Sequence, residues 1–151
     1  MSEKIDSLKK KIIEFQTNIV ELKSNVHNQK QQFTARETNL MQGLFEILDD
    51  FENLETTIQK KENEFDKTTK LLMKSFRSVN KKLIRLLKSF DIFQIEFLDN
   101  KAVLEYCKIV DTEKRSDLES ETIITLVKNG YINKKNNVVL RKAAVVTATS
   151  E

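Results

Sequence analysis

The 151-residue sequence contains no proline, no tryptophan, two glycines and a single cysteine. Because proline is the residue that interrupts helices most strongly, its absence permits long continuous helices. The lone Cys107 cannot form an internal disulfide, and with one histidine in the chain it offers no recognisable set of metal ligands. We therefore expect no metal site, no cofactor and no disulfide framework.

Long apolar runs are also missing. No stretch approaches the ~20 apolar residues that a membrane-spanning helix needs. The first residues lack the apolar core of a signal peptide, because Lys and Glu flank Ile12 and Ile13. The 26 basic and 23 acidic residues leave a net charge of +3, too balanced to indicate nucleic acid by itself. These absences predict a protein with no membrane, nucleic-acid or small-molecule partner, located in the cytoplasm or inside an organelle.

What the sequence does contain is a long stripe of apolar residues at alternating steps of three and four. Such a stripe stays on one face of a helix only if the helix supercoils with a partner. In the first 26 residues, β-branched residues occupy the a positions and Leu or Phe the d positions, which favours two parallel strands. The sequence thus predicts a homodimer through a parallel coiled coil, with the interface formed by Ile5, Leu8, Ile12, Phe15, Ile19, Leu22, Val26, Phe33, Leu40, Leu44, Ile47, Phe51 and Leu54.

The stripe changes character twice along this helix. Residues 27–39 are largely polar, which indicates either a soft point or binding face, or a solvated segment that frays. Residues 40–58 carry a wider apolar face than a two-stranded seam needs, which is typical of a helix with more than one neighbour. A second helical pattern begins at Phe65 and ends near Ser89-Phe90-Asp91. Two such helices from each of two chains predict a four-helix bundle.

From Ile92 the pattern changes to short runs rich in Ile, Val, Phe, Tyr and Thr. They predict strands over Ile92–Phe97, Val103–Val110, Thr122–Lys128 and Val138–Ala148. The polar segment Asn133–Asn137 is typical of a hairpin tip. A unit of about 58 residues has a marginal core, so we expect it to lean on the helices. The predicted fold class is α+β.

The predicted domains follow the same order along the chain. They are an N-terminal coiled-coil helix (1–39), the helices of a dimeric four-helix bundle (40–91) and a small all-β domain (92–149).

Two segments in this order resemble the GrpE co-chaperones. Residues 44–54, LFEILDDFENL, are similar to the family's LLPVLDNLERAL stretch. The C-terminal GYINKKNNVVLRKAAVVTAT is similar to the family's closing pattern of Gly-Tyr, a short loop and Leu/Ile-Arg-x-Ala-x-Val, met here by Gly130, Tyr131, Leu140, Arg141, Ala143 and Val145. Where the family often has proline, this chain has Glu46 and Lys142.

The resemblance implies a non-catalytic function. A GrpE-like dimer would dock a β domain and part of its helices on the ATPase domain of a DnaK-type heat-shock chaperone. It would stabilise the open nucleotide cleft, so that ADP leaves faster, and would thereby assist protein folding and the heat-stress response. In this family the long helices are also associated with heat-dependent loosening, for which residues 27–39 are the natural soft point.

The resemblance also implies a set of chaperone-binding residues, namely Gly130, Tyr131, Val139, Arg141 and Val145. Strand alternation puts Val139 and Val145 on the same face as Arg141. Arg141 is either a charge-assisted contact to a chaperone carboxylate or a solvated strand arginine. Tyr131 is either a core residue or an interface aromatic. We expect Gly130 to serve a turn with positive φ.

A run of acidic residues on the first helix raises the possibility of acid–base chemistry. Asp49, Asp50, Glu52 and Glu55 nevertheless have no accompanying nucleophile, metal-ligand set or phosphate loop. We interpret them as the solvated face of the helix, and we expect no enzyme.

Two other classes of protein remain open. The chain could be a coiled-coil structural or tethering protein whose β domain binds something other than a chaperone. A nucleic-acid-binding coiled coil is less favoured, because the basic residues are dispersed and not interleaved with aromatic residues.

Overall fold

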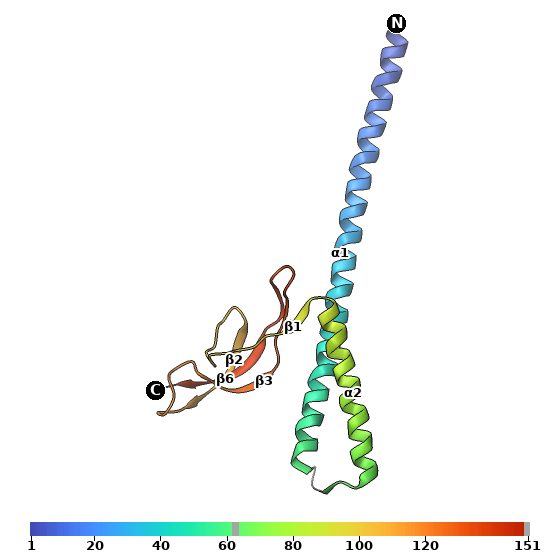
Figure 1. Cartoon of the computed structure of the whole chain (residues 1–151). Helices are drawn as coiled ribbons and strands as arrows, with labels where there is room; N and C mark the ends of the chain where they lie inside the picture. The colour runs from blue at the N-terminus through green and yellow to red at the C-terminus, as the bar shows by residue number, and fades with distance from the viewer. Residues whose placement is uncertain (62–63, 150–151) are drawn as a thin grey trace. The chain divides into compact units, whose positions relative to one another are not determined.

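The computed structural model describes residues 1–61 and 64–149 of the chain (Figure 1). It has two helices followed by six strands, which confirms the predicted α+β class and the order of its parts. The chain divides into two units, Met1–Gly43 and Leu44–Glu151. The boundary between them lies within the first helix, α1 (Ser2–Lys61).

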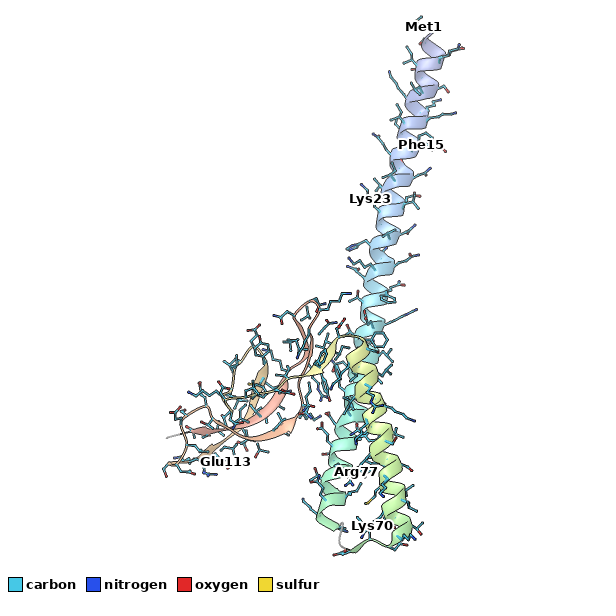
Figure 2. The ribbon with its side chains drawn as sticks, viewed as in Figure 1. Met1, Phe15, Lys23, Lys70, Arg77 and Glu113 are labelled. Atoms are coloured by element: carbon cyan, nitrogen blue, oxygen red, sulfur yellow. The ribbon has the colours of Figure 1, made fainter. Side chains whose placement is uncertain are left out.

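The first unit consists of helix α1 alone. Every side chain from Met1 to Leu40 is exposed in the single chain, and Figure 2 shows those of Phe15 and Lys23 projecting from the helix. Apolar residues of the predicted seam are among them, for example Ile12 at 47% and Phe15 at 61% exposure. The helix is continuous through residues 27–39, so the polar stretch does not interrupt it.

In the second unit, helix α2 (Lys67–Ser89) lies beside the C-terminal part of α1 (Figure 1). Asp66 caps its N-terminus by accepting a hydrogen bond from the Thr69 amide at 2.9 Å. The helix ends at the predicted position, and Asp91 follows with a φ of 60°. Phe51 and Phe76 stack between the two helices with ring centroids 4.6 Å apart.

An ion pair adds to this helical contact. Arg77 lies on α2 and is labelled in Figure 2. Its Nε donates to both oxygens of Glu55 on α1, at 3.0 and 3.1 Å.

The strands form two three-stranded sheets. In the first, β1 (Ile92–Gln94), β4 (Tyr131–Asn133) and β5 (Val138–Arg141) pair antiparallel in the order β1-β4-β5. In the second, β6 (Ala143–Thr149) lies between β2 (Cys107–Lys114) and β3 (Ile123–Lys128), parallel to β2 and antiparallel to β3. The predicted hairpin tip at 133–137 is confirmed as the connection between β4 and β5.

The core of the second sheet is small. Cys107, Ala143 and Val145 are its buried centre, and Phe97, Ala102 and Ile123 pack against them. Cys107 therefore packs as a small, buried apolar group.

Several predicted strand boundaries are wrong, and the second strand also runs past Val110 to Lys114. Residues 103–106 form a turn in which the amides of Tyr106 and Cys107 both donate to the Val103 carbonyl, so the strand begins at Cys107. The first strand ends at Gln94, not at Phe97. The predicted strand Val138–Ala148 is two strands in different sheets, broken at Lys142. Apolar alternation alone does not reveal a change of partner strand between neighbouring residues.

Candidate functional site

Two of the residues predicted from the sequence, Tyr131 and Arg141, lie where α1 contacts the β strands of the second unit. On α1, Phe45, Asp49 and Glu52 follow each other at steps of four and three, so they share one side of the helix. Their partners are Tyr131, Arg141 and Asn129. We call these six residues the helix–β joint.

The centre of the joint is the ion pair between Arg141 and Asp49. Nη1 and Nη2 of Arg141 donate to the two oxygens of Asp49 at 2.8 and 2.6 Å, a bidentate geometry. The two side chains are only 14% and 12% exposed. Arg141 is therefore not the solvated strand arginine that was one of the two readings of the sequence. The carboxylate that it contacts belongs to its own chain.

Arg141 also fixes the segment that precedes β4. Its Nε and Nη2 donate to the backbone carbonyl of Asn129 at 3.0 and 2.7 Å. The guanidinium lies 5.4 Å from the ring centre of Phe45 and 5.2 Å from that of Tyr131, within the range of cation–π attraction.

Aromatic stacking forms the apolar half of the joint. Phe45 is fully buried, and its ring stacks on Tyr131 with centroids 4.3 Å apart and planes 2° apart. Tyr131 is 5% exposed, which confirms that it is a core residue, and this burial raises the pKa of its phenol above the ordinary range. The wider apolar face predicted for residues 40–58 thus has a second neighbour, because Phe45 packs on the β strands.

Glu52 completes the joint on the polar side. Asn129 donates a hydrogen bond from Nδ2 to Glu52 Oε1 and accepts one from Gln94 Nε2. Partial burial raises the pKa of the Glu52 carboxyl, an effect that the hydrogen bond from Asn129 opposes and the charge of Asp49 reinforces.

The interpretation of the acidic run as a solvated face is therefore wrong for three of its four members. Asp49 pairs with Arg141, Glu52 with Asn129 and Glu55 with Arg77. Asp50 is exposed. The signal that could have identified Asp49 and Glu52 was their spacing from Phe45, which places them on an apolar side of the helix.

Gly130 is required for a different reason from the one predicted. Neither glycine has a positive φ, so the expected turn is wrong. A Cβ at Gly130 would lie 2.6 Å from the Ala143 amide nitrogen and 3.0 Å from the Arg141 carbonyl oxygen. The glycine permits close approach of backbone segments between the two sheets.

The remaining predicted site residues lie nearby. Val139 is half-buried on β5 and pairs with Ile132 of β4, whereas Arg141 pairs with Tyr131. Because a register shift separates these two pairs, Val139 lies on the opposite face of β5 from Arg141, and the alternation predicted from the sequence is wrong here. Val145 is fully buried in the second sheet, beyond the break at Lys142. Val145 therefore does not share a strand face with Arg141, and the alternation predicted from the sequence is wrong for this pair.

A substitution at Glu52 tests the electrostatics of the joint. Because the folded state raises the pKa of Glu52, the folded chain binds a proton more readily than the unfolded chain, and stability falls as the pH rises through the folded pKa. Glu52→Gln retains an acceptor for Asn129 without the charge. We expect it to raise the thermal midpoint at pH 7, and we expect the gain to vanish as the pH falls below about 4.5, the ordinary carboxyl value.

Glu55→Gln is the matched control, and we expect it to change the thermal midpoint in the opposite direction. The hydrogen bond from Arg77 lowers the pKa of Glu55, so this carboxylate stabilises the fold above its ordinary pKa and the contribution is lost as the pH falls. We expect a small decrease of the thermal midpoint at pH 7. Equal shifts of the two variants at pH 7 would contradict this assignment of the two carboxylates.

The described residues show neither a metal cluster nor a membrane span. Within residues 1–61 and 64–149, no group of three or more His, Cys, Asp or Glu side chains could hold a metal ion. In the same ranges, neither α1 nor α2 has a segment long and apolar enough to cross a bilayer.

The fold and the joint define an α+β protein in which a small β domain is fastened to a helical hairpin by a buried ion pair and an aromatic stack. The GrpE family model matches residues 1–149, nearly the whole chain, and the chain therefore belongs to the GrpE family. Members of this family are nucleotide exchange co-chaperones of DnaK and not catalytic enzymes. A comparison with curated proteins found no match for the chain.

Proposed function

We propose that this protein is a nucleotide exchange factor that binds the ATPase domain of a DnaK-type chaperone and promotes the release of ADP. The observation that carries the proposal is the family match over residues 1–149, which includes both helices and all six strands. Such a factor assists protein folding and the heat-stress response by returning the chaperone to its ATP-bound form.

The proposed mechanism is a shift of population and not a chemical step. The ATPase domain exchanges between a closed cleft that retains ADP and an open cleft that releases it. At saturation, a factor that binds the open state more tightly than the closed state multiplies the ratio of open to closed clefts by the ratio of its two affinities. No catalytic residue or cofactor of the factor is needed for this.

We further propose that the β domain supplies the contact surface, around β5. Val139 lies on this strand and retains partial exposure, and Arg141, on the opposite face of the strand, joins it to α1. Gly130, Tyr131 and Val145 are buried, so their contribution to chaperone binding is to shape the surface from beneath. A rigid surface binds with less loss of conformational entropy than a flexible one.

We also propose that the active form is a parallel homodimer. The heptad side chains of α1 are exposed in the single chain, among them Ile5, Leu8, Ile19 and Leu22 at 49–62%. The helical hairpin exposes a second apolar set, Ile47 and Leu54 on α1 with Leu72, Val79 and Leu86 on α2. The α2 members recur every seven residues, which fits a bundle formed with a second hairpin. We place the dimer in the cytoplasm.

Release of a fluorescent ADP analogue from the DnaK-type chaperone of the same source tests the proposal. We expect the protein to accelerate release at concentrations where light scattering gives about twice the 17.6 kDa of one chain. Arg141→Ala is expected to reduce the acceleration at least about tenfold, since it removes a charge-assisted pair from a buried site. Arg115→Ala, which removes an exposed arginine on the same domain, is the matched control and should change little.

Failure to accelerate release by a well-folded dimer, with any DnaK-type chaperone of the source, would contradict the proposal. It would favour the structural or tethering role that the coiled-coil pattern also allows.

A further inference from the structure

The helix–β joint combines aromatic, ionic and hydrogen-bonding contacts in a small region. A stacked aromatic pair, a bidentate ion pair and a hydrogen bond from a side-chain amide all connect two turns of α1 with residues 129–141. Asp49 lies in the middle of the three helix residues, and its side chain is 12% exposed. Lys128 approaches the same carboxylate at 3.7 Å. A carboxylate that receives two cations at this depth couples the helix to the β domain more tightly than surface charges do.

The donors of Arg141 are largely consumed inside the chain. A guanidinium has five N–H donors. Four hydrogen bonds are formed within the chain, two to the Asp49 carboxylate and two to the Asn129 carbonyl. The side chain is 14% exposed. The guanidinium of Arg141 is therefore occupied mainly by contacts within the helix–β joint.

We propose that Asp49 is a positioning residue, whose carboxylate holds Arg141 and thereby fixes the orientation in which the β domain meets the chaperone. This inference rests on the proposed exchange function. Arg141 then acts on the chaperone through the position of its domain, and its substitution affects exchange because the joint loosens.

The physical consequence concerns the two states of the nucleotide cleft. A factor with a rigid joint fits only one arrangement of the ATPase domain, which gives it a large difference in affinity between the open and closed clefts. A factor with a loose joint can follow the domain into the closed state and remain bound. Its difference in affinity then falls, and with it the largest acceleration that it can produce.

Asp49→Asn is the informative substitution, because it keeps the size and one acceptor of the side chain but removes its charge. Asp50→Asn is the matched control, since Asp50 is the next residue on the helix and is exposed. In the free protein, residual dipolar couplings report the relative orientation of α2 and the β domain. We expect one common alignment for the wild type and the Asp50→Asn variant, and two separate alignments for Asp49→Asn.

Exchange kinetics provide the second readout. We expect Asp49→Asn to lower the maximal rate of ADP release at saturating factor about tenfold, with a change of less than about threefold in the half-saturating concentration. A variant that is merely partly unfolded behaves in the opposite way, because a smaller active fraction raises the apparent half-saturating concentration and leaves the maximum unchanged. Circular dichroism melting of each variant accompanies the assay.

A double-substitution cycle separates positioning from direct contact. If Arg141 acts through the joint, Arg141→Ala adds less than about twofold in the Asp49→Asn background, because the pair is already lost. Full additivity of the two losses would overturn the proposal.

The two proposals fail in distinguishable ways. If the wild type does not accelerate ADP release, the exchange function fails, while the dipolar couplings of the free protein still report whether Asp49 fixes the joint. If the wild type is active and Asp49→Asn retains both its common alignment and its maximal rate, the positioning role alone is overturned.

Discussion

Substitution of Phe45 by alanine is expected to destabilise the second unit by about 3–5 kcal/mol, the range found when a large aromatic side chain is removed from a core. Phe45 has no exposed surface, and its ring stacks on Tyr131 at 4.3 Å. Its removal also leaves the Arg141 guanidinium without one of its two aromatic faces. The loss therefore combines a cavity, a broken stack and a weakened ion-pair environment.

Urea unfolding measures this loss. Because the chain has two tyrosines and no tryptophan, tyrosine fluorescence reports on the β domain without an added probe. Leu98→Ala is the control, since Leu98 is 93% exposed and its loss should cost less than about 0.5 kcal/mol. A cost below about 1 kcal/mol for Phe45→Ala would mean that the stack with Tyr131 does not hold the β domain on the helix.

The two glycines are expected to respond to alanine with opposite signs. At Gly130 the new methyl group would lie 2.6 Å from a backbone nitrogen and 2.8 Å from Cδ1 of Ile95. Because backbone atoms cannot move aside as the end of a side chain can, we expect Gly130→Ala to destabilise the protein by about 3 kcal/mol. The sheets would separate where Arg141 and Ala143 approach Gly130.

At Gly43, nothing lies within 4 Å of the added methyl group, and the residue is inside α1. Alanine has less backbone entropy to lose than glycine, so Gly43→Ala should stabilise the helix by about 0.5–1 kcal/mol. Thermal unfolding followed by circular dichroism compares the two variants directly. A decrease in stability for both would show that Gly43 also has a close neighbour, for example in a dimer.

The helices were predictable because their signals are local. The three- and four-residue spacing of apolar side chains and the absence of proline predicted both α1 and α2, and the polar residues at 133–137 predicted the hairpin between β4 and β5. Each of these signals depends on residues a few positions apart, which the order of the chain reveals directly. The family resemblance was likewise readable, since it requires only motifs in the right order.

The joint was only partly predictable. Arg141, Tyr131 and Gly130 were identified through the resemblance, but their partners on α1 were not. The acidic residues of that helix have the spacing and composition of an ordinary solvated face, and Asp49 lies 92 residues from Arg141 in the sequence. The spacing from Phe45 places Asp49 on the apolar side of the helix, but no local signal identifies the residue with which its carboxylate pairs.

Packing of the β domain on α1 determined which side chains are buried and where the strands begin and end. It turned Phe45 and Asp49 inward while Ile47 and Leu54, on the same helix, stayed exposed. It broke the apolar run after Arg141 between two sheets, and it made Gly130 necessary through close packing and not through a turn. The periodicity of the chain determines which elements form, because it sets which side chains share one face of a helix or strand. Which side chains meet depends on contacts between distant residues, and these exist only once the elements have packed.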